Sequence, residues 1–169
     1  MDNKILVLKE ILIKEMEDYF ENDKKRTNHA KKVMAYAEEL LKKEKADWPV
    51  VISASILHDT GIKISEKKYK SADGYYQEKE GPSIARKILL KTDLSNKNID
   101  EICEIITHHH TPGIVNTQNF KVLYDSDCLV NLKDEIHLLN KKKLLKIIEK
   151  TFLTNTGKNL AIIIYCHDS

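Results

Sequence analysis

The chain has 169 residues, of which 41% are hydrophobic and 32% charged, and its 28 basic and 26 acidic residues leave a formal net charge of +2. This is enough to close one hydrophobic core, so we expect a single domain over residues 1–169. The well-mixed charges do not favour nucleic acid as a partner, and three cysteines without a C-x-x-C pair indicate neither a disulfide framework nor a zinc finger. No apolar run approaches the roughly 20 residues that span a bilayer and no signal-peptide pattern opens the chain, so we expect a cytoplasmic protein with no membrane partner.

Apolar residues recur at helical spacing through most of the chain, without the alternation typical of strands, which predicts an all-α bundle. Asp47 is expected to cap the third helix, and Gly61 to end it in a left-handed conformation. The polar stretch 65–81 is expected to be a long connection, after which Pro82 opens the next helix. In chain order, the expected helices cover about residues 5–19, 27–44, 47–61, 82–89, 98–109, 119–132, 141–152 and 156–165.

Two histidines lie on the apolar faces of expected helices. His29 precedes Val33 by four residues, and His58 follows Ala54 by four. A single histidine in such a place is more often a satisfied core residue than a ligand. Asp59 is harder to accommodate, because a carboxylate in the last turn of a helix meets the negative end of the helix dipole and loses hydration when buried. A bound cation would cancel both penalties.

Asp127 and a histidine triplet complete the set of polar residues at inward positions. Asp127 falls in the centre of an apolar stripe, and of His108, His109 and His110 the middle one lies on the inner face of its helix with His108 beside it. Taken singly, Asp127 could be exposed or paired with a lysine, and the histidines could complement the helix dipole. Together, imidazole and carboxylate groups from at least four helices form the ligand set of Zn, Mn, Fe and related divalent ions.

The order of His29, the doublet His58-Asp59 and Asp127 resembles the motif of the HD superfamily of metal-dependent phosphohydrolases. The resemblance covers roughly residues 10–165. Within it, the chain is similar to small stand-alone bacterial HD proteins, which are mostly predicted hydrolases. It implies an HD-domain helical bundle with a motif core of about 25–135 and flanking helices. The segments that carry it are RTNHAKKVMAYAEELL, ILHDTGIKISEKKY, EGPSIARKIL, ICEIITHHHTPG, DSDCLVNL and FLTNTGKNL.

The resemblance also implies a ligand set. The four motif residues would hold one divalent metal ion, with Asp59 placed to bridge toward a second. Glu80, His108 and His109 are the matching candidates for that second ion. One or two ions are expected, and the sequence does not distinguish among Fe, Mn, Zn, Ni, Co and Mg.

A metal-activated water would then hydrolyse a phosphate ester, a nucleotide being one candidate, without a protein nucleophile. The absence of a G-x-S-x-G elbow, a P-loop and a G-x-G-x-x-G phosphate cradle agrees with this. Asp59 would orient the water or receive its proton. Whichever of His108, His109 and His110 is not a ligand would protonate the leaving oxygen.

Substrate-binding candidates follow from the need to hold phosphate. Arg26 lies one turn before His29, and Lys63 follows the His-Asp doublet closely enough to bind an anion there or assist the reaction. Arg86 is the other of only two arginines in the chain. Tyr76, with its neighbours in the expected connection 65–81, could stack on a base, cover the site, or only pack the loop.

Two other functions remain open at this point. A ferritin-like di-iron oxygenase is disfavoured because neither Glu101 nor Glu104 has a histidine three residues later, but an oxygenase on the HD scaffold would use nearly the same ligands. A non-catalytic protein that binds a nucleotide or second messenger would need metal and ligand without turnover. The substrate and the oligomeric state, including a homodimer, stay open.

Overall fold

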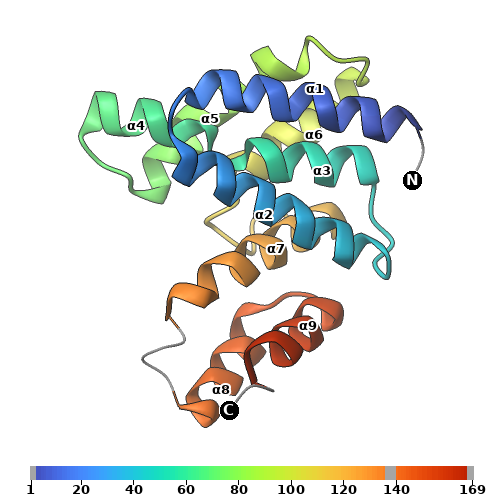
Figure 1. Cartoon of the computed structure of the whole chain (residues 1–169), viewed down its shortest axis with the longest axis vertical. Helices are drawn as coiled ribbons and strands as arrows, with labels where there is room; N and C mark the ends of the chain where they lie inside the picture. The colour runs from blue at the N-terminus through green and yellow to red at the C-terminus, as the bar shows by residue number, and fades with distance from the viewer. Residues whose placement is uncertain (1–2, 136–139, 167–169) are drawn as a thin grey trace.

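The computed structural model describes residues 3–135 and 140–166, and within these ranges it contains helices and no strand (Figure 1). The all-α fold predicted from the apolar spacing is therefore confirmed. None of the helices in the described ranges combines the length and hydropathy that crossing a membrane requires. The elements are α1 (Asn3–Phe20), α2 (Lys24–Leu41), α3 (Trp48–Leu57), the 3-10 turn η1 (His58–Thr60), α4 (Gly61–Tyr69), α5 (Gly74–Leu89), α6 (Asn96–Thr107), α7 (Gln118–Glu135), α8 (Lys141–Thr151) and α9 (Asn155–Cys166).

Helix α3 is the centre of the bundle. Every residue from Val50 to Leu57 is buried, and the helix packs against α1, α2, α6 and α7 (Figure 1). As predicted, Asp47 caps it by accepting a hydrogen bond from the Val50 amide at 3.3 Å, with Pro49 in the first turn. Because α3 has no solvent-facing side, the His58–Thr60 turn that follows it directly also lies inside the protein.

The segment after α3 differs from the sequence-based expectation. Gly61 has a right-handed φ of −65° and begins α4 after η1, so it does not end a helix through a left-handed residue. Its missing side chain serves a close helix contact instead, since a Cβ there would lie 2.2 Å from the Gln77 carbonyl oxygen on α5. The expected long connection 65–81 is largely helical, and Pro82 lies inside α5. Tertiary packing of η1 and α4 against α5 outweighs the helix-breaking residues that suggested a loop.

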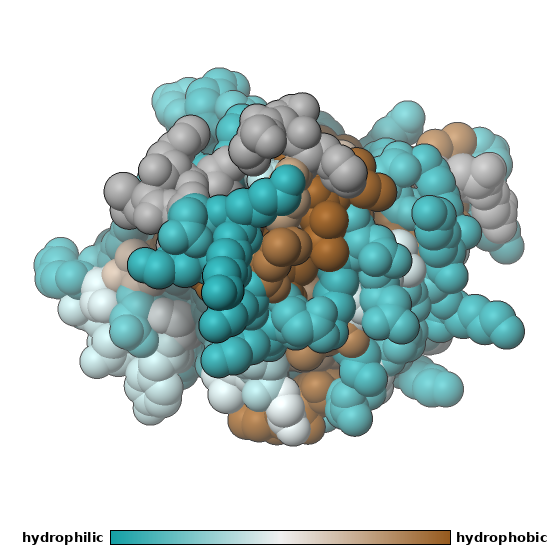
Figure 2. All heavy atoms as spheres, turned by 90° about the horizontal axis from the view of Figure 1, so that it is seen from below, coloured by the Kyte–Doolittle hydropathy of each residue, from teal (hydrophilic) through white to brown (hydrophobic). Residues whose placement is uncertain are grey.

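Helices α8 and α9 form a pair at the end of the molecule away from α1, where α9 packs on α7 (Figure 1). From that side the surface shows hydrophilic side chains around a smaller hydrophobic area (Figure 2). The buried Asp125 of α7 fastens the connection between the two helices. Its carboxylate accepts hydrogen bonds from the amides of Leu153 at 2.7 Å and Thr154 at 2.8 Å, and from the Thr154 hydroxyl at 2.7 Å.

Asp125→Ala is expected to lower the free energy of unfolding by about 3 kcal/mol, because three donors, two of them in buried hydrogen bonds, lose their acceptor. Urea denaturation followed by circular dichroism measures the change. Asp93→Ala, at an exposed aspartate in the connection before α6, serves as the control and is expected to stay within about 0.5 kcal/mol of the wild type. Equal stability of the two variants would show that Asp125 does not fasten the α8–α9 pair.

Candidate metal centre

Five side chains that are distant in the sequence meet at the C-terminal end of α3. His29 comes from α2, His58 and Asp59 from η1, His109 from the loop after α6, and Asp127 from α7. His29 Nε2 lies 3.0 Å from Asp127 Oδ1 and 3.3 Å from His58 Nε2. Asp59 Oδ2 lies 3.5 Å from Nε2 of both His29 and His58, and Asp59 Oδ1 lies 3.7 Å from His109 Nε2. Asp59 therefore faces His29 and His58 with one carboxylate oxygen and His109 with the other.

Backbone hydrogen bonds orient the two deepest histidines. His58 is 1% exposed and its Nδ1 lies 3.0 Å from the Ser55 carbonyl oxygen, while His109 is 3% exposed and its Nδ1 lies 2.7 Å from that of Ile106. Each Nδ1 therefore donates its proton to the backbone, which directs each Nε2 at Asp59 and leaves it able to bind a cation through its lone pair once it carries no proton. His109 Nε2 is buried without a hydrogen-bond partner among the described residues. A lone pair facing a carboxylate is stabilised when a cation lies between them, so the donor set fits a divalent ion.

The carboxylates of the cluster are ionised. Burial opposes their charge, but the positive charge of His58 and the nearby His109 lower the pKa of Asp59, and the adjacent His29 and His58 lower that of Asp127. Burial likewise opposes a charged His58, yet the negative Asp59 and Asp127 raise the pKa of His58 to about 9. In the absence of metal, the cluster thus draws in a proton to offset its negative charge. A divalent cation would provide that compensation more fully.

His110 extends the cluster on its more exposed side. One ligand atom from each of Asp59, His109 and His110 lies within 4.8 Å of the others, as in the group His29, His58 and Asp59. The His110 ring is held by His109, with ring centroids 3.9 Å apart, and by Gly74, where a Cβ would come within 2.8 Å of the ring. Burial lowers the pKa of His110, which leaves a neutral ring able to act as a ligand. Asp59 belongs to both groups.

Comparison with known proteins agrees with this arrangement. The family model for the HD domain matches residues 26–151. The chain belongs to the HD domain family. The crystal structure of a predicted HD superfamily hydrolase from an uncultured Thermotogales bacterium is similar in fold, with a TM-score of 0.69 and 22% sequence identity over 92% of this chain and 83% of that one. No curated protein matches the chain.

His108 does not take the place expected from the HD resemblance. Helix α6 ends at Thr107, and His108 follows as its C-cap with φ of −127°, so the helical face is not continued through the triplet. The chain turns there, which directs His109 inward and brings His110 to its side. Among the described residues, His108 belongs to neither group of candidate ligands.

Glu80 is also not brought to the cluster. Because α5 begins at Gly74 and not at Pro82, Glu80 lies in mid-helix on the side facing α4. Its Oε1 accepts hydrogen bonds from the Tyr69 hydroxyl at 2.7 Å and from Lys68 Nζ at 2.9 Å, and these two bonds lower the pKa of Glu80. This glutamate connects α4 and α5 and belongs to neither group of candidate ligands in the described chain.

Arg26 and Lys63, expected to bind phosphate, have partners within the protein. Arg26 is hydrogen-bonded to Asp23, which caps α2, and its Nη2 lies 2.6 Å from Glu66. Lys63 Nζ donates to the Tyr19 carbonyl oxygen at 2.8 Å. Binding a substrate through either cation would first require breaking these contacts.

Arg86 and Tyr76 are likewise used in helix contacts. Arg86 Nη2 lies 2.6 Å from Asp100 and so joins α5 to α6. Tyr76 stacks on Tyr69 with ring centroids 4.2 Å apart, which packs α5 against α4. In this structure both side chains therefore have roles in holding α5 in place.

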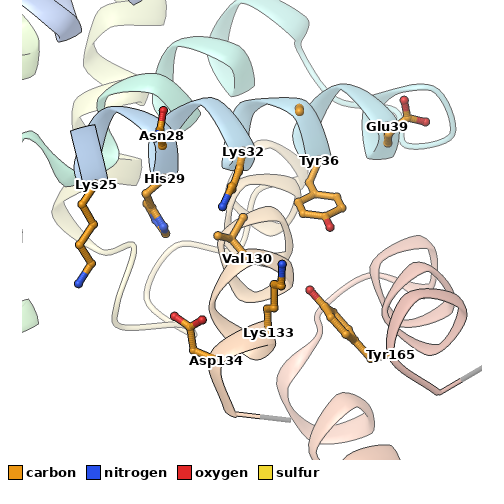
Figure 3. A pocket seen from close by; sticks show the side chains of 11 residues that line it. Lys25, Asn28, His29, Lys32, Tyr36, Glu39, Val130, Lys133, Asp134 and Tyr165 are labelled. Carbon is orange, nitrogen blue, oxygen red and sulfur yellow. The ribbon is translucent and has the colours of Figure 1, made fainter. Parts of the chain in front are cut away.

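A pocket that sequence reasoning did not locate begins at His29. It has a volume of about 610 Å³ and lies among α2, α7 and α9 (Figure 3). On α2 its lining residues recur every three or four positions, so a search for polar residues one turn from His29 would have found Lys25 and Lys32. The lining residues are Lys25, Asn28, His29, Lys32, Ala35, Tyr36, Glu39, Val130, Lys133, Asp134 and Tyr165.

Proposed function

We propose that this HD protein is a metal-dependent phosphohydrolase that acts on a small phosphate ester, with nucleotides among the candidates. The observation that carries the proposal is the orientation of His58 and His109, whose Nδ1 atoms contact backbone carbonyls and whose Nε2 atoms face the ionised Asp59. His29, His58, Asp59 and Asp127 would hold one divalent ion. Asp59, His109 and His110 would hold a second, with His110 in the place first expected for His108.

The proposed chemistry assigns distinct tasks to the side chains. A bound divalent ion lowers the pKa of coordinated water from about 15.7 toward 7 and polarises a phosphoryl oxygen. Asp59 is shared by both ligand groups and would orient the attacking water and accept its proton. The backbone bonds of His58 and His109 keep both rings fixed throughout. Substrate would approach from the pocket that His29 lines, while the leaving oxygen would take its proton from solvent there.

The test measures metal and turnover on the same samples. Protein purified without chelator and reconstituted with Mn or Fe is expected to retain transition metal and to release inorganic phosphate from at least one compound in a panel of nucleotides and simple phosphate esters. Ligand binding without phosphate release would favour a sensor, and oxygen consumption by the iron form would favour an oxygenase. Either result, or failure to bind metal, would refute the proposed hydrolase.

A further inference from the structure

Two lysines from different helices extend into the pocket beside His29. Lys32 comes from α2 and Lys133 from α7, and Figure 3 shows both side chains reaching into the space between these helices. Both are exposed, and neither forms an ion pair or hydrogen bond with the residues that the structure describes. Lys31 of α2 differs, since its Nζ lies 2.5 Å from Glu17. The two pocket ammonium groups are therefore available to an external anion.

The charge around the pocket is not balanced by its own carboxylates. Lys25, Lys32 and Lys133 line it together with the acids Glu39 and Asp134. Glu39 lies 2.5 Å from Lys42, which is outside the lining, so its charge is already compensated. Three ammonium groups then face the single carboxylate of Asp134. Such an excess of positive charge in a concave site attracts and holds anions.

The lysine pair lies at a defined distance along the helix from the candidate metal centre. Lys32 follows His29 by three residues, which places it about one helical turn, roughly 5 Å, further along α2. Beyond it, Tyr36 and Tyr165 provide aromatic surface for the organic part of a ligand. A phosphoryl group at the metal centre and a second anionic group at Lys32 can therefore belong to one small molecule.

We infer that Lys32 and Lys133 form a second anion site, which binds a phosphate group other than the one hydrolysed, so that the substrate carries at least two phosphate groups. The inference rests on the proposed phosphohydrolase function for the identity of the group at the metal centre. The lysine pair itself is identified independently of that function: both side chains line the pocket, and neither has an ion-pair partner in the described chain. It selects doubly phosphorylated ligands over singly phosphorylated ones.

The test compares ligands that share one nucleoside. Calorimetry on the manganese-loaded protein measures the binding of adenosine 5′-monophosphate, adenosine 5′-diphosphate and adenosine 3′,5′-bisphosphate. At least one of the two doubly phosphorylated ligands is expected to bind about 10-fold more tightly than the monophosphate, the size of one charge-assisted contact. The double variant Lys32→Gln/Lys133→Gln is expected to lose this preference and to bind the monophosphate within about 2-fold of wild type.

A second double variant controls for net charge. Lys67→Gln/Lys97→Gln removes two exposed lysines on α4 and α6 and is expected to keep the preference. The inference is overturned if wild type shows no preference, if the Lys32 and Lys133 variant keeps it, or if the control loses it equally. Phosphate release and metal content of the same samples report on the proposed function separately, since binding preference requires no turnover.

Discussion

Asp59→Asn is expected to lower phosphate release by at least about 100-fold, the low end of the loss for a group that takes part in proton transfer. Asparagine keeps the shape of the side chain but removes the charge shared by both ligand groups. Its amide would also direct donor protons at one side of the cluster, toward ring nitrogens that must offer lone pairs to bind a metal ion. Asp59 Oδ2 faces His29 and His58 at 3.5 Å, and Oδ1 faces His109 at 3.7 Å. Whichever oxygen the amide nitrogen replaces, one of the two ligand groups therefore loses an acceptor.

The comparison needs a variant with the same change of charge elsewhere. Asp93→Asn replaces an exposed aspartate before α6 and is expected to release phosphate at the wild-type rate. Circular dichroism of both variants should remain helical, which separates a chemical defect from a folding defect. Wild-type turnover and metal content in Asp59→Asn would mean that the carboxylate is structural, and the proposed mechanism would be wrong.

The sequence was sufficient to place the motif residues because helical periodicity alone decides which positions face inward. His29 and Asp127 occupy apolar stripes of α2 and α7, and the uniformly apolar α3 carries His58 and Asp59 into the interior. These placements depend on local pattern and on the need to cover hydrophobic faces. The all-α fold follows from the same information.

The remaining site residues depend on tertiary contacts that periodicity does not encode. The choice of His110 over His108 is made where α6 ends at Thr107, and the ring of His110 is then held against Gly74. Glu80 was expected beside the metal, but residues 74–89 form a helix on which Gly61 packs closely, and this helix directs Glu80 to Tyr69 and Lys68. Arg26 is a further example. It was expected to bind substrate because the chain has only two arginines, but in the folded protein it pairs with Asp23 and Glu66.

The number of bound ions is expected to separate the three adjacent histidines. Titration of the metal-free wild type with Mn should saturate near two ions per chain. The His109→Ala variant should saturate near one, because His109 belongs to the second ligand group and is buried beside Asp59. His108→Ala is the matched control. It removes the neighbouring imidazole, which lies outside both ligand groups in the described chain, and should leave the stoichiometry near two.

Thermal stability gives an independent measure of the same assignment. An ion that binds only the folded state, at a concentration 100 times its dissociation constant, adds about 2.7 kcal/mol of stability. For a chain of this size that corresponds to a rise in Tm of roughly 5–10 °C per ion, so wild type and His108→Ala, which are expected to bind two ions, should show about twice this rise. His109→Ala should gain less, since His29, His58, Asp59 and Asp127 still hold one ion but Asp59 no longer has a second cation to bridge. If His108→Ala loses an ion and His110→Ala does not, the turn after α6 directs the other histidine to the metal, and the second ligand group described here is incorrect.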